Sequence, residues 1–143
     1  MSDVGMILQR IGATLVQDVA PKLEGDYSGG HAGISGVMAV MAGEMWDKEA
    51  DLLANEIARL RALLEAAGMG DDVPEAASLK ISDLKATRNA LSEQLIALQT
   101  RLEAADDEAS RALNTQIWAH LLATSAARMP SPPAFAAAES EAT

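Results

Sequence analysis

The sequence predicts an all-α fold, an antiparallel four-helix bundle in which the second and third helices form a long hairpin. Composition is the first observation, because aromatic residues make up 3% of the chain while the abundant Ala, Leu and Met suit helices. The second is that apolar residues recur every three or four positions in four segments, as on one face of a helix. The third is that short turn-like stretches separate these segments, which favours antiparallel neighbours.

Ser2 and Asp3 are candidate caps of the first helix, which is expected to end or kink at Pro21, before a turn over residues 26–30. The second helix is expected from about His31 to Ala67. Its apolar stripe consists of Trp46, Ala50, Leu53, Ile57, Leu60, Leu64 and Ala67. The heptad-like spacing of this stripe suits packing against a facing helix.

The same register, extended backwards, falls on small residues. These are Ala32, Gly36, Ala39 and Gly43. Each interior glycine costs a helix about 1 kcal/mol relative to alanine, so the small stripe predicts close approach of the first helix or of a partner helix. The alternative is that the first turns of this helix are irregular. The candidates for close packing or dimer contacts are Gly36, Ala39, Gly43, Leu53, Leu60, Leu95 and Leu102.

The third helix is expected to start near Ser78 or Ser82 and to pair antiparallel with the second. Asp106 and Asp107 are candidate caps for a fourth helix that ends near Arg128. Because the two middle helices are longer than the outer ones, part of their leucine stripes stays uncovered in a monomer. This surplus apolar surface predicts a homodimer.

Residues 1–129 are expected to form one helical domain, which is long enough to bury a core. Residues 130–143 are rich in Pro and Ala and are expected to form a tail that is mobile unless a partner orders it. A net charge of -10 argues against nucleic-acid binding. No secretory signal is visible, and no apolar run approaches the ~20 residues of a membrane helix. Together with the lack of cysteine, this predicts a soluble cytoplasmic protein without a membrane partner.

The glycines that precede and open the second helix match neither the dinucleotide fingerprint nor the P-loop, since no strand precedes them and no lysine follows before Lys48. A weaker anion site at the helix start, next to His31, stays open as an alternative. Helical bundles hold bridged metals with Glu-x-x-His pairs, and the sequence contains none. Glu44, Asp47 and Asp51 share a face that is expected to be solvated. We therefore expect no metal and no cofactor.

No Gly-x-Ser-x-Gly elbow occurs in the sequence. His120 lies on an apolar face, which is more typical of a hydrogen-bonded core histidine than of a catalytic base. The sequence therefore favours a non-enzymatic interaction domain. The alternative is a small-molecule binder or enzyme with a pocket between the first, second and fourth helices. The candidate lining residues of that pocket are His31, Met38, Met41, Trp46 and His120.

Two stretches carry a resemblance to a known family: "LVQDVAPKLEGDYSGGHAGISGVMAVMAGEM" and, after the leucine-rich hairpin, "IWAHLLATSAARM". The matching positions are Val19, Pro21, Leu23, Glu24, Gly25, His31, Glu44, His120, Leu121 and Ala127. In these positions the chain resembles a small all-helical domain family of unknown function, whose members are fused to or encoded beside aminoglycoside-phosphotransferase-like kinases and acyl-CoA dehydrogenases. The resemblance implies an accessory module that serves such an enzyme, and it implies no catalytic residue.

Overall fold

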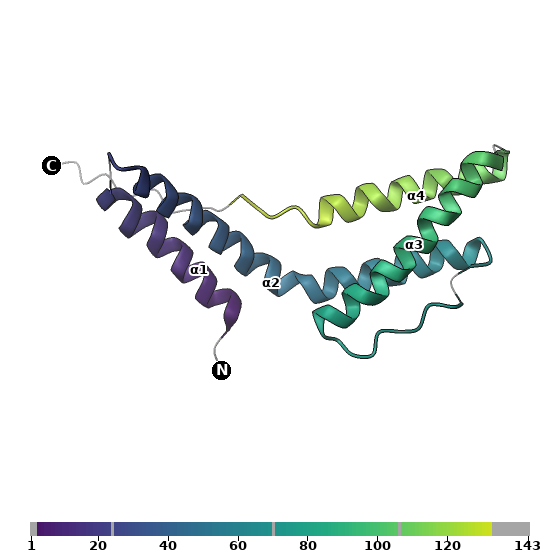
Figure 1. Ribbon diagram of the computed structural model, residues 1–143, viewed down its shortest axis with the longest axis horizontal. Coiled ribbons are helices and arrows are strands. Elements are labelled where there is room, and N and C mark those ends of the chain that lie inside the picture. Colours follow the sequence, from purple (N-terminus) through teal and green to yellow (C-terminus); the bar gives the residue numbers. More distant parts are fainter. Residues whose placement is uncertain (1–2, 24, 70, 106, 133–143) are drawn as a thin grey trace. The chain divides into compact units, whose positions relative to one another are not determined.

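A computed structural model describes residues 3–23, 25–69, 71–105 and 107–132 of the chain (Figure 1). Within these ranges there are four α-helices and no strand. The helices are α1 (Val4–Thr14), α2 (Tyr27–Ala66), α3 (Ile81–Ala105) and α4 (Glu108–Ala127). The predicted all-α fold class is confirmed, and the packing of the helices is consistent with a helical bundle.

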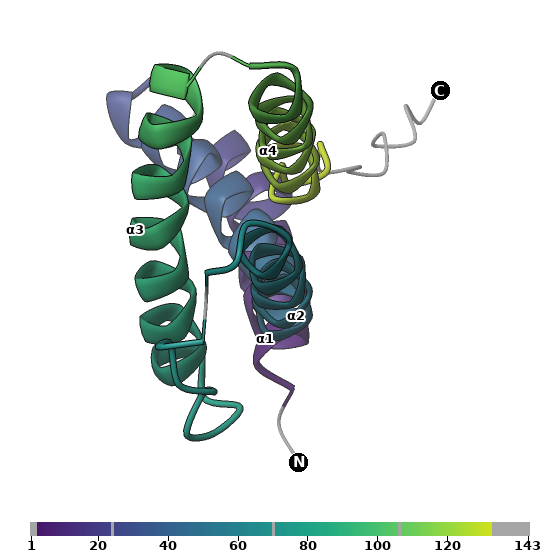
Figure 2. The same ribbon diagram turned by 90° about the vertical axis from the view of Figure 1, so that its right-hand side faces the viewer.

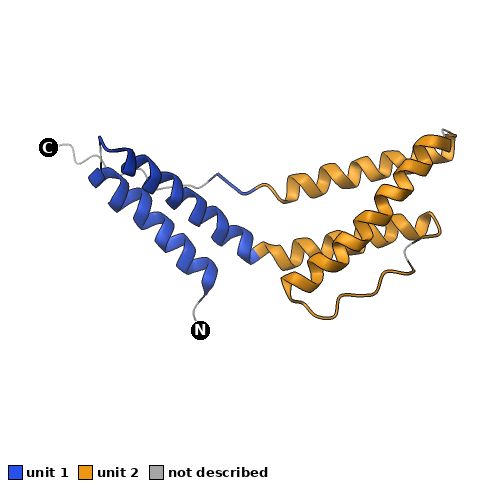
Figure 3. Cartoon of the chain, viewed as in Figure 1, with its two compact units in different colours: residues 1–47, 130–143 blue, residues 48–129 orange. Residues whose placement is uncertain are grey.

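The chain divides into two compact units (Figure 3). Unit 1 comprises residues 1–47 and 130–143, and unit 2 comprises residues 48–129. Helix α2 contributes its first half to unit 1 and its second half to unit 2. Residues 133–143, which form most of the expected tail, lie outside the described residues.

Unit 1 is an antiparallel hairpin in which α1 packs closely against the first half of α2. Gly12 lies opposite Gly36, and a Cβ atom at Gly36 would lie 2.7 Å from the carbonyl oxygen of Gly12. One heptad away, Gly5 lies opposite Gly43, and a Cβ atom at Gly43 would lie 2.7 Å from the carbonyl oxygen of Gly5. The backbones of the two helices therefore touch along a stripe of glycines, an approach that larger side chains would prevent.

The connection between α1 and α2 is shorter than the sequence suggests. A π-helical turn over Leu15–Val19 and a 3-10 turn over Ala20–Leu23 extend the first helical segment. Gly25 then takes a positive φ of 90°, which glycine adopts without steric cost. The Asp26 carboxylate accepts hydrogen bonds from the backbone N–H and the hydroxyl of Ser28. This cap starts α2 at Tyr27, so the glycines expected in a turn lie inside the helix.

Unit 2 holds the hydrophobic core, which α2, α3 and α4 surround (Figure 2). The buried members of the core are Leu60, Leu64, Val73, Leu91, Leu95, Leu98 and Ile117. Val73 lies in the linker that follows α2. Helix α2 ends at Ala66, and Gly68, two residues later, takes a positive φ of 66°. The leucine stripes predicted on the second and third helices thus face each other inside one chain.

The direction of α3 differs from the expected antiparallel hairpin with the second helix. Lys85, in the first turns of α3, forms an ion pair of 2.9 Å with Glu49 of α2. Near the other end of α3, the Arg101 guanidinium donates to the sulfur of Met69, which follows α2. The start of α3 thus lies beside the earlier part of this half of α2, and the end of α3 lies beside its C-terminal end. Helix α3 therefore runs in the same direction as the second half of α2 (Figure 1).

The linker between the two helices makes this direction possible, because it folds back along α2. The Arg61 guanidinium donates 3.0 Å hydrogen bonds to the carbonyl oxygens of Val73 and Pro74. The linker can span up to ~45 Å at ~3.3 Å per residue. Helix α2 rises by only ~1.5 Å per residue, so the linker is long enough to return along it. The antiparallel hairpin of unit 2 is the one formed by α3 and α4.

Candidate functional site

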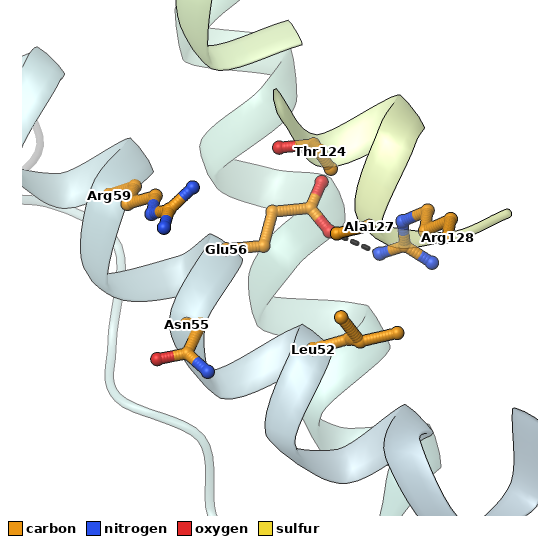
Figure 4. Close-up of a pocket in the computed structure, with 7 residues that line it drawn as sticks. All are labelled: Leu52, Asn55, Glu56, Arg59, Thr124, Ala127 and Arg128. Atoms are coloured by element: carbon orange, nitrogen blue, oxygen red, sulfur yellow. Dashed lines mark hydrogen bonds and ion pairs between the residues drawn. The ribbon is translucent and has the colours of Figure 1, made fainter. Parts of the chain in front are cut away.

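A cavity of about 190 Å³ opens between α2 and the end of α4 within unit 2 (Figure 4). Its lining residues are Leu52, Asn55, Glu56, Arg59, Thr124, Ala127 and Arg128. The four residues from α2 are spaced by three and four positions, which places them on one face of the helix. The three residues from α4 belong to its last turn and its C-cap.

Glu56 and Arg128 form an ion pair across this cavity (Figure 4). The Glu56 side chain is buried, with 9% of the residue exposed. A buried carboxylate without a partner is strongly unfavourable, and the guanidinium of Arg128 supplies that partner by hydrogen bonding to Oε2. The pair therefore ties the end of α4 to the second half of α2.

His120 is the second buried ionisable residue of this region, at 8% exposure. Burial lowers the pKa of His120; the nearby Glu56 carboxylate raises it and the Arg59 guanidinium lowers it. The Nδ1 atom of His120 is buried and has no hydrogen-bond partner among the described residues. These surroundings favour the neutral imidazole.

Arg59 and Asn55 are exposed and supply polar groups to the cavity. Neither takes part in a hydrogen bond or ion pair within the described part of the chain. With two arginines and one glutamate, the lining carries one net positive charge. In the described residues, no group of three or more His, Asp or Glu could hold a metal ion. The chemistry that this cavity offers is hydrogen bonding to an anion.

Unit 1 presents a different candidate, an uncharged apolar face on the α1–α2 hairpin. Given the antiparallel glycine register, the helical wheel places one flank of α1 and one flank of α2 on the same side. We define the apolar face by Val4, Leu8, Ile11, Leu15, Met38, Ala39, Ala42 and Trp46. Among its members, Ile11 is 49% exposed, Trp46 is 59% exposed and Met38 is 64% exposed. The hairpin therefore leaves large apolar side chains in contact with solvent.

The pocket residues expected from the sequence lie in both units. His31 is exposed on α2, where its ring packs at 4.4 Å against the ring of Tyr27. Met38 and Trp46 belong to the apolar face, Met41 is half-buried on α2, and His120 lies in unit 2. The cavity between α2 and α4 is lined by none of these five residues.

The residues expected to form close packing or dimer contacts also separate into two groups. Gly36 and Gly43 face α1, and Ala39 is half-buried beside them. The four leucines lie in unit 2: Leu53, Leu60 and Leu95 are buried, and Leu102 packs against the core. A second copy of the chain would therefore have to use other apolar residues, and the apolar face supplies them.

Sequence reasoning missed Glu56 and Arg128 as site residues. A signal for Glu56 was present, because it is a charged residue three positions after Leu53 and four before Leu60, which places it beside the apolar stripe of α2. A carboxylate at such a position indicates a buried ionic partner. No comparable signal marked Arg128, which is 72 residues away in the sequence.

None of the helices in the described ranges is both long enough and apolar enough to cross a membrane. The comparisons with known proteins add no further constraint on the activity. No protein-family model, curated protein or solved structure matches this chain.

Proposed function

We propose that the chain is a non-enzymatic interaction module that associates with a second copy of itself through the apolar face of unit 1. The observation that carries the proposal is the exposure of large apolar side chains along one side of a two-helix hairpin. Contiguous exposed apolar surface marks interaction sites in soluble proteins. Burying it yields roughly 25 cal/mol per Å².

The hairpin itself explains why this surface is left over. Two helices bury only the stripe along which they touch, and here that stripe is made of glycines, which contribute no side chains to a core. The larger residues stand on the flanks instead. Met38 and Trp46 are of residue types that are enriched at protein interfaces. These exposed side chains are therefore better suited to an interface with another chain than to a core within unit 1.

A second copy of the chain is the partner that we propose for the apolar face. Two hairpins related by a two-fold axis supply four helices, which is a common stable arrangement of helices around a shared core. The segment from Tyr27 to Gly43 contains no Asp, Glu, Lys or Arg. This part of α2 can therefore meet its copy without opposing like charges, although each chain carries a net charge of -10.

Two matched substitutions on α1 test this proposal. Ile11 and Met6 are each 49% exposed, but the helical wheel places Ile11 on the apolar face and Met6 on the opposite flank. We expect the native chain and Met6→Glu to be dimers at micromolar concentration and Ile11→Glu to be a monomer, as measured by multi-angle light scattering. Circular dichroism should show equal helix content in all three. A monomeric native chain, or equal weakening by both substitutions, would contradict the proposal.

The accessory role extends this proposal to an enzyme partner. The resemblance in "LVQDVAPKLEGDYSGGHAGISGVMAVMAGEM" supports a partner of the aminoglycoside-phosphotransferase-like kinase or acyl-CoA dehydrogenase class. The dimer is then the form that serves the enzyme. Co-purification of such an enzyme with the native chain and with Met6→Glu supports this role, and recovery of no enzyme with either chain opposes it.

A further inference from the structure

We propose that the cavity between α2 and α4 binds a small monocarboxylate, held by the guanidinium of Arg59. This binding site lies in unit 2 and does not depend on association through unit 1. Arg59 can bind an anion with its whole guanidinium group, because it forms no hydrogen bond or ion pair within the described part of the chain, whereas Arg128 is paired with Glu56. Guanidinium groups recognise carboxylates through two parallel hydrogen bonds.

The charges of the lining select a singly charged anion. Arg128 already neutralises the buried Glu56 carboxylate, so the positive charge of Arg59 is the one left without a counterion. A monocarboxylate would balance it, whereas a polyanion would meet the carboxylate of Glu56. In the view of Figure 4, Glu56 lies between the two arginines. Thr124 adds a hydroxyl group to the same lining.

The size of the cavity and its apolar residues restrict the ligand further. A cavity of about 190 Å³ accommodates one small organic molecule, since a protein cavity of roughly 150 Å³ is large enough to bind benzene. Leu52 and Ala127 give part of the lining an aliphatic character. A short aliphatic acid such as butyrate matches both the charge and the volume, with its carboxylate at Arg59 and its chain against these side chains.

Butyrate, titrated into the full-length protein at constant ionic strength, is the probe for this site. We expect saturable changes in the amide NMR signals of Leu52, Asn55, Thr124 and Ala127. Butyramide has the same shape but no charge, and it should produce no saturable change. An independent readout is His120, because the positive charge of Arg59 lowers its pKa. A bound carboxylate should therefore raise the pKa of His120.

Variants assign the binding to Arg59. Arg59→Gln should weaken butyrate binding by about tenfold or more, since it removes a charged hydrogen-bond donor. Arg10→Gln is the matched control, because Arg10 is an exposed arginine of α1 in unit 1, and it should bind as the native chain does. The proposal is overturned by a lack of saturable butyrate shifts, by equal shifts with butyramide, or by unchanged binding in Arg59→Gln.

Discussion

His120 links the pH of the solution to the stability of unit 2. Burial is the main cause of its lowered pKa; the Glu56 carboxylate opposes the shift and the Arg59 guanidinium adds to it. The usual histidine pKa of 6.5 applies in the unfolded chain. Below that pH the unfolded chain takes up the proton first. The folded state therefore loses stability as the pH falls through 6.5 toward the lower folded pKa.

His120→Gln should remove this part of the pH dependence. In the native chain we expect the free energy of unfolding to fall between about pH 7.5 and about pH 5.5, and in the variant to fall less over that range. Urea unfolding followed by circular dichroism at several pH values measures both slopes. Carboxylates such as Asp107, whose pKa the Ser110 N–H lowers from 3.8, titrate below this range. Equal slopes in the two chains would show that His120 is not responsible.

The candidate ligand site illustrates what a single sequence can and cannot reveal about residues. Glu56 adjoins the apolar stripe of α2, and that is visible in the sequence. Its partner Arg128 is not, because the contact forms only when α4 folds back along α2. Likewise, His120 was correctly placed on a helix face with apolar neighbours, but the charges that surround it come from α2.

The glycine stripe sets the distance between α1 and α2. A Cβ atom at Gly36 would lie 2.7 Å from the carbonyl oxygen of Gly12 and 2.9 Å from the Cβ atom of Leu15. Neither backbone can move without disturbing the hairpin. By contrast, a Cβ atom at Gly30 of the same helix would meet no atom within 4 Å. Two glycines of one helix therefore have opposite structural roles.

Gly36→Ala and Gly30→Ala should change stability in opposite directions. Overpacking at Gly36 is expected to cost about 1–3 kcal/mol, whereas at Gly30 alanine should stabilise the helix by about 0.5–1 kcal/mol because it restricts the unfolded chain. Thermal unfolding followed by circular dichroism at one protein concentration compares both variants with the native chain. A neutral or stabilising Gly36→Ala would mean that the helices do not approach as closely as the structure shows.

Elements were more predictable from the sequence than their directions. Periodicity located four helices, and the expected cap at Asp107 accepts a 2.7 Å hydrogen bond from the backbone N–H of Ser110. The direction of α3 was not encoded in the same pattern, because its leucine stripe can face α2 in either orientation. The linker decided the direction. Its hydrogen bonds to Arg61 hold it along α2, and no periodic pattern in the sequence indicates such contacts.

Charge and apolar surface are unevenly distributed along the chain. The net charge is -10, yet none of the eight residues of the apolar face is charged. Two acidic chains repel each other at long range, whereas the contact between two apolar faces that we propose is attractive. These two interactions respond differently to salt, because screening acts on charges and leaves apolar burial intact. Ionic strength can therefore separate an apolar interface from one made of ion pairs.

The proposed dimer should become tighter as salt is added. The Debye length shortens from about 30 Å at about 0.01 M salt to about 3 Å at about 1 M, so the repulsion between two acidic chains declines while the apolar contact persists. Sedimentation equilibrium across this range measures the dissociation constant, which is expected to fall. Ile11→Glu should stay monomeric throughout. If the dissociation constant rises instead, ion pairs hold the two copies together, and the contact surface is not the uncharged apolar face of unit 1.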